Sequence, residues 1–159
     1  MHQLLIAQYE GIKGARQALF AYCRTMSNVD LLTKSETFSN SSILMLLTHV
    51  ANSYLHWVKF FDLQIPPQYF NEEAASNMKD IEHMFEQVDS AIAGFLSRYK
   101  ANYEERFTKT HPRKNQLITT TPLLLFTHVI THEFHHKGQI LTMSRLLGYK
   151  PVDTDVIRT

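Results

Sequence analysis

The sequence has one cysteine, little net charge and no long apolar run, and each shortage argues against a class of protein. Cys23 cannot form an internal disulfide, so we expect a small buried apolar residue and no oxidising compartment. A net charge of +1 gives no general attraction to nucleic acid or to an anionic membrane. The longest apolar runs, at residues 44–47 and 123–126, are too short to span a membrane, and no secretory signal is evident. We therefore expect a soluble cytoplasmic protein without nucleic-acid or membrane partners.

The sequence does contain four long segments in which apolar residues recur at helical spacing. They cover roughly residues 2 to 26, 40 to 62, 81 to 99 and 121 to 147. Residues 28–36 are expected to form a turn and a loop, residues 100–120 an exposed loop, and no strand is convincing. With 44% hydrophobic residues in 159, the chain can bury a full core as a single domain, residues 1–159. The pattern predicts an all-α protein, specifically a four-helix bundle.

Two residues at each end mark the limits of the last helix. Thr121 suits a capping position and Pro122 suits the first helical turn. Gly148, followed by Pro151, suits the end. The last helix therefore has a signal at both its start and its end.

The same helix carries four histidines, His128, His132, His135 and His136. Residues four apart lie one turn apart on one helix face, so His132 and His136 place their imidazoles side by side. Neutral imidazole is a common ligand of zinc, nickel and iron. Spacing alone leaves other pairs open, because His128 with His132 is also four apart and His132 with His135 is three apart. The sequence therefore predicts a chelating pair within this run.

A third metal ligand is expected from the segment 40–62. His49 and His56 are seven residues apart, hence near one face, and His49 lies in the apolar run LMLLTHVA. An imidazole there must be hydrogen-bonded or bound to a metal, and beside a histidine pair on another helix we favour the metal. His56 is expected to line a pocket and the adjacent Trp57 to pack in the core. The remaining histidines are expected at the surface: His2, His83 and His111.

Residues 132–136 also match H-E-x-x-H, the zinc-binding helix of many metallopeptidases, in which the glutamate activates water. The context disfavours this interpretation, because no glutamate follows Glu133 and no histidine follows His136 as a third ligand. Glu133 lies about 100° round the helix from His132, so it is either an acid or base or a residue of a neighbouring groove. Gln139 is a second candidate catalytic residue, able to orient a ligand, or else a packing amide.

These residues and their positions resemble the DinB/YfiT family of metal-dependent proteins. The resemblance is carried by His49 and by a closing-helix pattern H-x-x-x-H-x-G-Q, formed by His132, His136, Gly138 and Gln139. It covers essentially the whole chain and implies an up-down-down-up four-helix bundle, often a homodimer. It also implies a divalent metal site whose ligands are His49, His132 and His136. The family includes thiol S-transferases and a maleylpyruvate isomerase that use low-molecular-weight thiols, while many members have no assigned reaction.

Three histidine ligands leave a coordination position open, which is typical of a catalytic site. We expect zinc or nickel, with iron or manganese as further candidates, to make a thiol or water nucleophile available near neutral pH. The leading hypothesis is a metal-dependent enzyme of the thiol S-transferase type with a low-molecular-weight thiol cosubstrate. A non-catalytic metal-binding or stress-response protein and a metal-dependent hydrolase are the alternatives. A thiol that carries carboxylates would need cations near the site, and the candidates are Lys59, Arg113 and Lys114.

Overall fold

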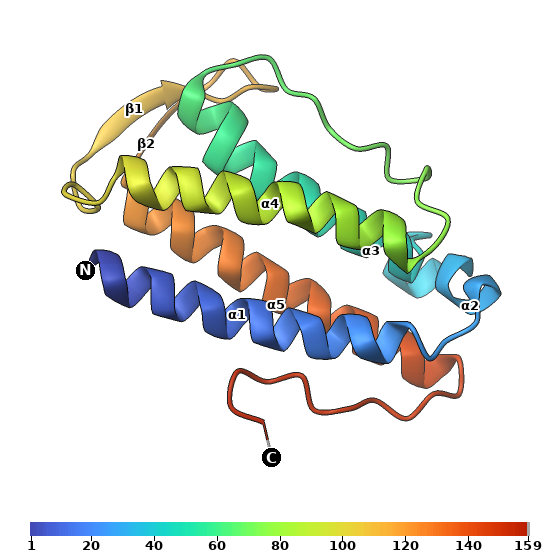
Figure 1. The fold of residues 1–159 in the computed structure, drawn as a ribbon. Coiled ribbons are helices and arrows are strands. Elements are labelled where there is room, and N and C mark those ends of the chain that lie inside the picture. Colours follow the sequence, from blue (N-terminus) through green and yellow to red (C-terminus); the bar gives the residue numbers. More distant parts are fainter. Residues whose placement is uncertain (159) are drawn as a thin grey trace.

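The computed structural model describes residues 1–158, which are mostly helical with one small two-stranded sheet (Figure 1). The long helices of this range are α1 (His2–Cys23), α3 (Ile43–Leu55) with its π-helical continuation η2 (His56–Phe61), α4 (Met78–Arg98) and α5 (Pro122–Leu146). Shorter elements join them: α2 (Asn28–Leu32), the 3-10 helix η1 (Glu36–Phe38), β1 (Phe107–Thr110) and β2 (Leu117–Thr120).

Polar side chains cap the helices where they begin. Free amide groups in the first turns of α3, α4 and α5 donate hydrogen bonds to Ser42, Asn77 and Thr121, respectively. Pro122 occupies the first turn of α5, where its missing N–H is not needed. Gly148 follows α5 with φ of 89°, a conformation that a glycine adopts without strain. The predicted start and end of the last helix are confirmed.

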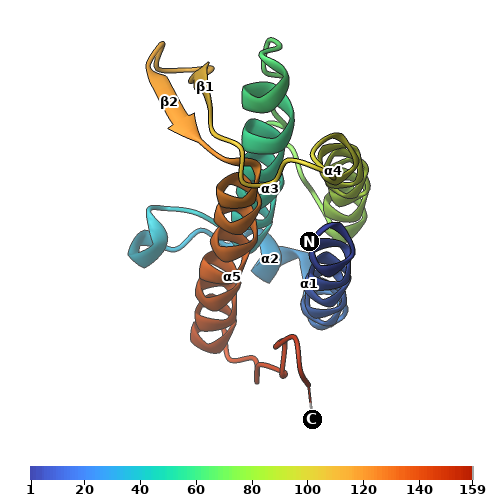
Figure 2. The same cartoon turned by 90° about the vertical axis from the view of Figure 1, so that its left-hand side faces the viewer.

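The core lies between the long helices, which lie side by side in both views (Figures 1 and 2). α3 packs against α4 and α5, and α1 packs against α4. The apolar stripe predicted for residues 81–99 faces this core, since Ile81, Val88, Ile92 and Phe95 are completely buried on α4. Cys23 is also completely buried, as predicted.

A buried ion pair joins α1 to α5. The Nε and Nη2 atoms of Arg16 donate hydrogen bonds to the two carboxylate oxygens of Glu133, at 2.9 and 3.0 Å. Its Nη1 donates to Asp89 of α4 at 2.7 Å, and the Tyr54 hydroxyl of α3 donates to Glu133. Arg16 is only 2% exposed. One network therefore connects α1, α3, α4 and α5 in the interior.

Two segments predicted to lack regular structure contain it. Residues 28–32 form α2, because the Ser27 hydroxyl caps the helix by accepting from the amide of Asp30, and α1 accordingly ends at Cys23. Residues 107–120 form an antiparallel hairpin in which Phe107 pairs with Thr120. Neither strand alternates apolar with polar residues, since their sequences are FTKT and LITT, so the usual strand pattern is missing. No helix within residues 1–158 combines the length and the apolar character needed to cross a membrane.

Candidate metal centre

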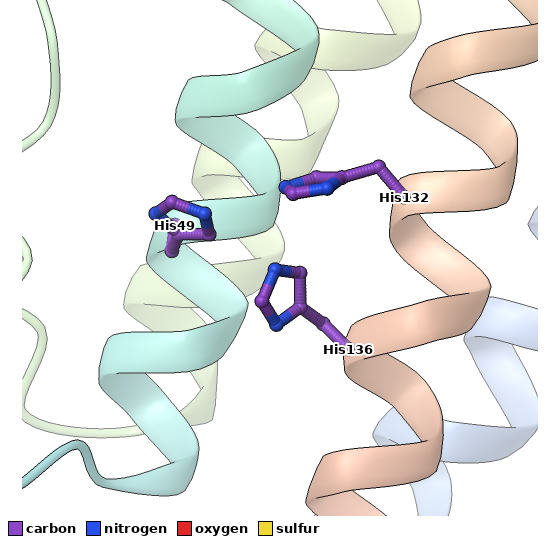
Figure 3. Close-up of side chains that lie close together, drawn as sticks. All are labelled: His49, His132 and His136. Carbon is purple, nitrogen blue, oxygen red and sulfur yellow. The ribbon is translucent and has the colours of Figure 1, made fainter. Parts of the chain in front are cut away.

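α3 and α5 bring three histidines together (Figure 3). His49 comes from α3, and His132 and His136 come from successive turns of α5. Their ring centroids are 4.9 Å apart for His49 and His136, 5.3 Å for His49 and His132, and 4.5 Å for the α5 pair. One ring nitrogen of each lies within 4.8 Å of those of the other two. The three side chains are therefore close enough to hold a metal ion.

The Nε2 atom of His132 tests whether a metal ion suits this group. Across residues 1–158, it is the one buried side-chain nitrogen or oxygen that lacks a hydrogen-bond partner. A buried polar atom without a partner is costly, because it has lost its bonds to water and gained none. A metal ion that accepts the nitrogen lone pair removes this cost. The histidines present therefore fit a divalent metal.

His49 and His136 each form a hydrogen bond through Nδ1, which leaves Nε2 of each ring for a metal ion. The Nδ1 of His49 lies 3.1 Å from Oε1 of Glu72, and the Nδ1 of His136 lies 2.7 Å from Oε1 of Gln139. Both partner oxygens accept hydrogen bonds, so each Nδ1 carries the hydrogen and the neutral ring keeps its lone pair on Nε2. Partners of this kind fix the tautomer and orientation of metal-binding histidines.

The pKa values favour the form of imidazole that binds a metal. Burial, assisted by the neighbouring rings of His136 and His49, lowers the pKa of His132 to about 4. Burial also lowers the pKa of His136. Both rings are therefore neutral near pH 7, and a neutral imidazole has a lone pair available.

The other two histidines of α5 lie outside this group. The ring of His128 stacks on His132 at 5.8 Å and packs edge-on against Trp57 at 5.2 Å. His135 is exposed, with its ring 5.0 Å from that of His136. The structure therefore groups His132 and His136 with His49, and leaves His128 and His135 outside that group.

A cavity of about 270 Å³ lies beside the three histidines. His49 and His132 form part of its wall, and the side chain of His49 is 43% exposed. Trp57 and His128 also line it, so Trp57 is a half-buried wall residue in addition to packing on the core. The cavity gives a small molecule access to the histidines.

The predicted cations divide between two places. Arg113 and Lys114 line the cavity, as expected for charges near the site. Lys59 does not, because it lies in a separate groove between η2 and α4. The prediction that Lys59 lies near the histidine site is therefore wrong, because its side chain projects from η2 toward α4.

The surface position predicted for His111 is also wrong. His111 is 9% exposed, and its ring lies 4.8 Å from that of His56 and 5.7 Å from that of Trp57. The hairpin, which the sequence did not predict, folds this residue against η2. His56 lines the same cavity, as expected, with its Nδ1 2.6 Å from the hydroxyl of Tyr69. Of the other histidines predicted at the surface, His83 is exposed, while His2 is partly buried beside Tyr103.

The two candidate catalytic residues have different surroundings. Glu133 has both carboxylate oxygens engaged by Arg16 and Tyr54 in the buried network, which disfavours a role as acid or base and with it the peptidase interpretation. Gln139 accepts a hydrogen bond from His136 and so orients that ring. Glu72 makes the equivalent contact to His49 and was missed, because nothing in the sequence distinguishes it from Glu73, which pairs with Lys34.

Known proteins resemble this chain over all or most of its length. The family model described as the DinB family matches residues 1–159, which include both helices of the histidine cluster. The chain is also 23% identical over 144 residues to the uncharacterized protein YizA of Bacillus subtilis (strain 168). That similarity spans 89% of this chain and 87% of YizA.

Proposed function

The chain belongs to the DinB family, and on that premise we propose that it binds a divalent metal ion, zinc or nickel in the first place, through His49, His132 and His136. The observation that carries the proposal is the buried, unpaired Nε2 of His132 beside two histidines of fixed orientation. Glu72 and Gln139 hold those two rings, so the three side chains need little rearrangement to bind.

We further propose that the site is catalytic and of the thiol S-transferase type. A divalent ion held there would lower the pKa of a bound thiol or water, and so supply a nucleophile near neutral pH. Three imidazoles do not fill the coordination sphere, and the adjoining cavity gives a small cosubstrate room to reach them. The cavity is lined by the aromatic rings of Trp57 and His128 and also by the charged side chains of Arg113 and Lys114, which suits a substrate with both apolar and polar parts.

The position of Glu133 favours a thiol over water as the nucleophile. Metal-dependent hydrolases commonly use a carboxylate base beside the metal to deprotonate water. Glu133, the obvious candidate in this sequence, is bound by Arg16 and Tyr54, and Glu72 is bound to His49. A thiol is more acidic than water and has less need of such a base.

Cobalt substitution tests this function. We expect the wild-type protein to bind cobalt and to develop a sulfur-to-cobalt absorption band when 2-mercaptoethanol is added. His132→Ala should not bind cobalt and should show no such band. His135→Ala, which changes an exposed histidine of the same helix, should behave as the wild type. Cobalt binding without a thiol-dependent band at millimolar concentration would contradict the transferase and leave the hydrolase or a non-catalytic metal protein. Failure to bind cobalt would contradict the metal site itself.

We also propose that the long helices form one domain, a four-helix bundle in up-down-down-up order, and that the protein is a homodimer. The long connection from η2 to α4, residues 62–77, supports the order, because neighbours that run in the same direction need a crossing segment. Met1 and Leu4, 58% and 66% exposed, place two neighbouring apolar side chains at the start of α1, and these support an interface there. Light scattering after size exclusion measures the mass, and a monomer at micromolar concentration would contradict the dimer.

A further inference from the structure

The tip of the β1–β2 hairpin forms one wall of the cavity beside the histidine cluster. Figure 2 shows the hairpin next to η2 and the start of α5. The tip has a defined conformation, because the amide of His111 donates to the carbonyl of Gln116 at 2.7 Å and the amide of Asn115 donates back to His111 at 3.2 Å. Asn115 adopts φ of 49°, which an asparagine tolerates in a tight turn. The backbone of this tip is therefore held in one conformation, which sets where its side chains begin.

His111 lines the cavity from this wall and has a hydrogen-bond donor. Its Nδ1 accepts hydrogen bonds from the backbone amides of Arg113 and Lys114, at 3.1 and 3.2 Å. Amides only donate, so Nδ1 is unprotonated and the neutral ring carries its hydrogen on Nε2. Burial lowers the pKa of His111, which keeps the ring neutral at pH 7.

Two cations lie on the same wall. The guanidinium carbon of Arg113 lies 4.2 Å from the centre of the Tyr69 ring, a cation–π contact that restrains the side chain. No salt bridge found between residues 1 and 158 uses either Arg113 or Lys114. The wall also contains one carboxylate, Glu72, which is bound to His49. The wall of the cavity therefore carries two positive charges, those of Arg113 and Lys114, and one negative charge, that of Glu72, which is hydrogen-bonded to His49.

The positive charges act on the interior of the cavity. Burial is the largest cause that lowers the pKa of His56 to about 4, and the nearby groups His111, Arg113, His128 and Lys114 add to it. Arg113 and Lys114 act through their positive charges, and positive charges on this wall favour an anion beside it.

We propose that the hairpin tip is an anion site, in which Arg113, Lys114 and the Nε2–H of His111 bind a carboxylate of a small-molecule substrate. The remainder of the substrate then lies beside Trp57 and the histidine cluster, since all of these residues line one cavity. The catalytic meaning of the site rests on the proposed function, whereas the binding itself needs no metal ion. Bidentate contact with Arg113 and a point charge from Lys114 suit a carboxylate.

Trp57 reports binding directly, because it is the single tryptophan of the chain and lines the cavity. We would titrate the protein at low ionic strength with succinate and with its uncharged diamide, succinamide, and follow tryptophan emission. Succinate is expected to bind about tenfold more tightly than succinamide. The double variant Arg113→Gln/Lys114→Gln should bind succinate about tenfold more weakly than the wild type and should bind succinamide as the wild type does.

Two further variants separate the site from general electrostatics and from misfolding. Lys59→Gln makes the same kind of charge change outside the cavity and should alter the succinate affinity by less than about twofold. Arg113→Lys/Lys114→Arg keeps the charges and should retain most of the affinity. An unchanged succinate affinity in Arg113→Gln/Lys114→Gln would overturn the proposal, as would an equal loss in Lys59→Gln or equal binding of succinate and succinamide by the wild type.

The titrations would be made with zinc-loaded protein and after zinc removal by a chelator. Tryptophan emission is read in both forms, so a protein that binds no metal contradicts the proposed function while the anion site is still measured. Retained succinate binding after zinc removal supports the hairpin site. Binding that is lost with zinc and is insensitive to Arg113→Gln/Lys114→Gln assigns the succinate to the metal, and overturns the hairpin site.

Discussion

Removal of either partner of the buried Arg16–Glu133 ion pair should destabilise the protein by about 3–5 kcal/mol, because a charge then remains in the interior without its counterion. The two single variants should differ. Arg16→Met leaves the Glu133 carboxylate with only the Tyr54 hydroxyl, whereas Glu133→Met leaves Arg16 its bond to Asp89. We therefore expect Arg16→Met near the upper end of this range and Glu133→Met near the lower end. The guanidinium carbon of Arg16 also lies 4.5 Å from the centre of the Phe85 ring, so Arg16→Met loses this cation–π contact as well and is destabilised further.

The double variant Arg16→Met/Glu133→Met removes both charges and fills the space with apolar atoms. Its cost should fall short of the sum of the single costs by at least about 2 kcal/mol, because each single variant includes the penalty of an unpaired charge. Urea unfolding in the presence of a chelator gives the free energies without a contribution from bound metal. Lys13→Met is the matched control on α1, since its pair with Glu10 is exposed and contributes less than about 1 kcal/mol. The account of the network would be refuted if each single variant lost less than about 1 kcal/mol of unfolding free energy, or if the loss in the double variant equalled the sum of the two single losses.

Three other predictions follow from single side chains. Burial raises the pKa of the Cys23 thiol to about 12, so a thiol reagent near pH 8 should modify Cys23 in urea and not in the native protein, as read by mass spectrometry. Burial holds the pKa of His56 at about 4, below its ordinary 6.5, so the unfolded chain binds the extra proton between these values. The free energy of unfolding should therefore fall as the pH drops through this window, and fall less in His56→Gln. Glu72→Ala and Gln139→Ala should each weaken zinc binding by about tenfold or more in a competition assay with a chromophoric chelator, and Glu73→Ala should not.

Local sequence signals predicted the long helices and part of the histidine cluster. Apolar spacing along α4 and the capping residues Thr121 and Pro122 act within a few residues, so they are visible in the sequence. Helix geometry predicts a chelating pair within residues 128–136, with His132 and His136 as one of the possible pairs. The choice of this pair over His128 with His132 came from the family resemblance. His49 was favoured by its place in an apolar run, and the resemblance added to that argument.

Contacts between distant segments account for what the sequence did not reveal. Arg16 and Glu133 are 117 residues apart, and nothing near either one in the chain indicates the partner. His111 is brought against His56 by a hairpin of two short strands, and the role of Glu72 depends on how its loop passes over α3. Such contacts depend on the packed fold, so local patterns along the sequence do not reveal them.

Metal content is the most direct test of the central claim. Untagged wild-type protein, analysed by mass spectrometry after purification and after reconstitution with zinc, nickel or iron, should carry close to one divalent ion per chain. His49→Ala and His132→Ala should lose most of it, because each removes one of the three clustered nitrogens, while the control His135→Ala should keep it. A wild-type protein that remains free of metal after reconstitution, or an equal loss in His135→Ala, would contradict the three-histidine metal centre.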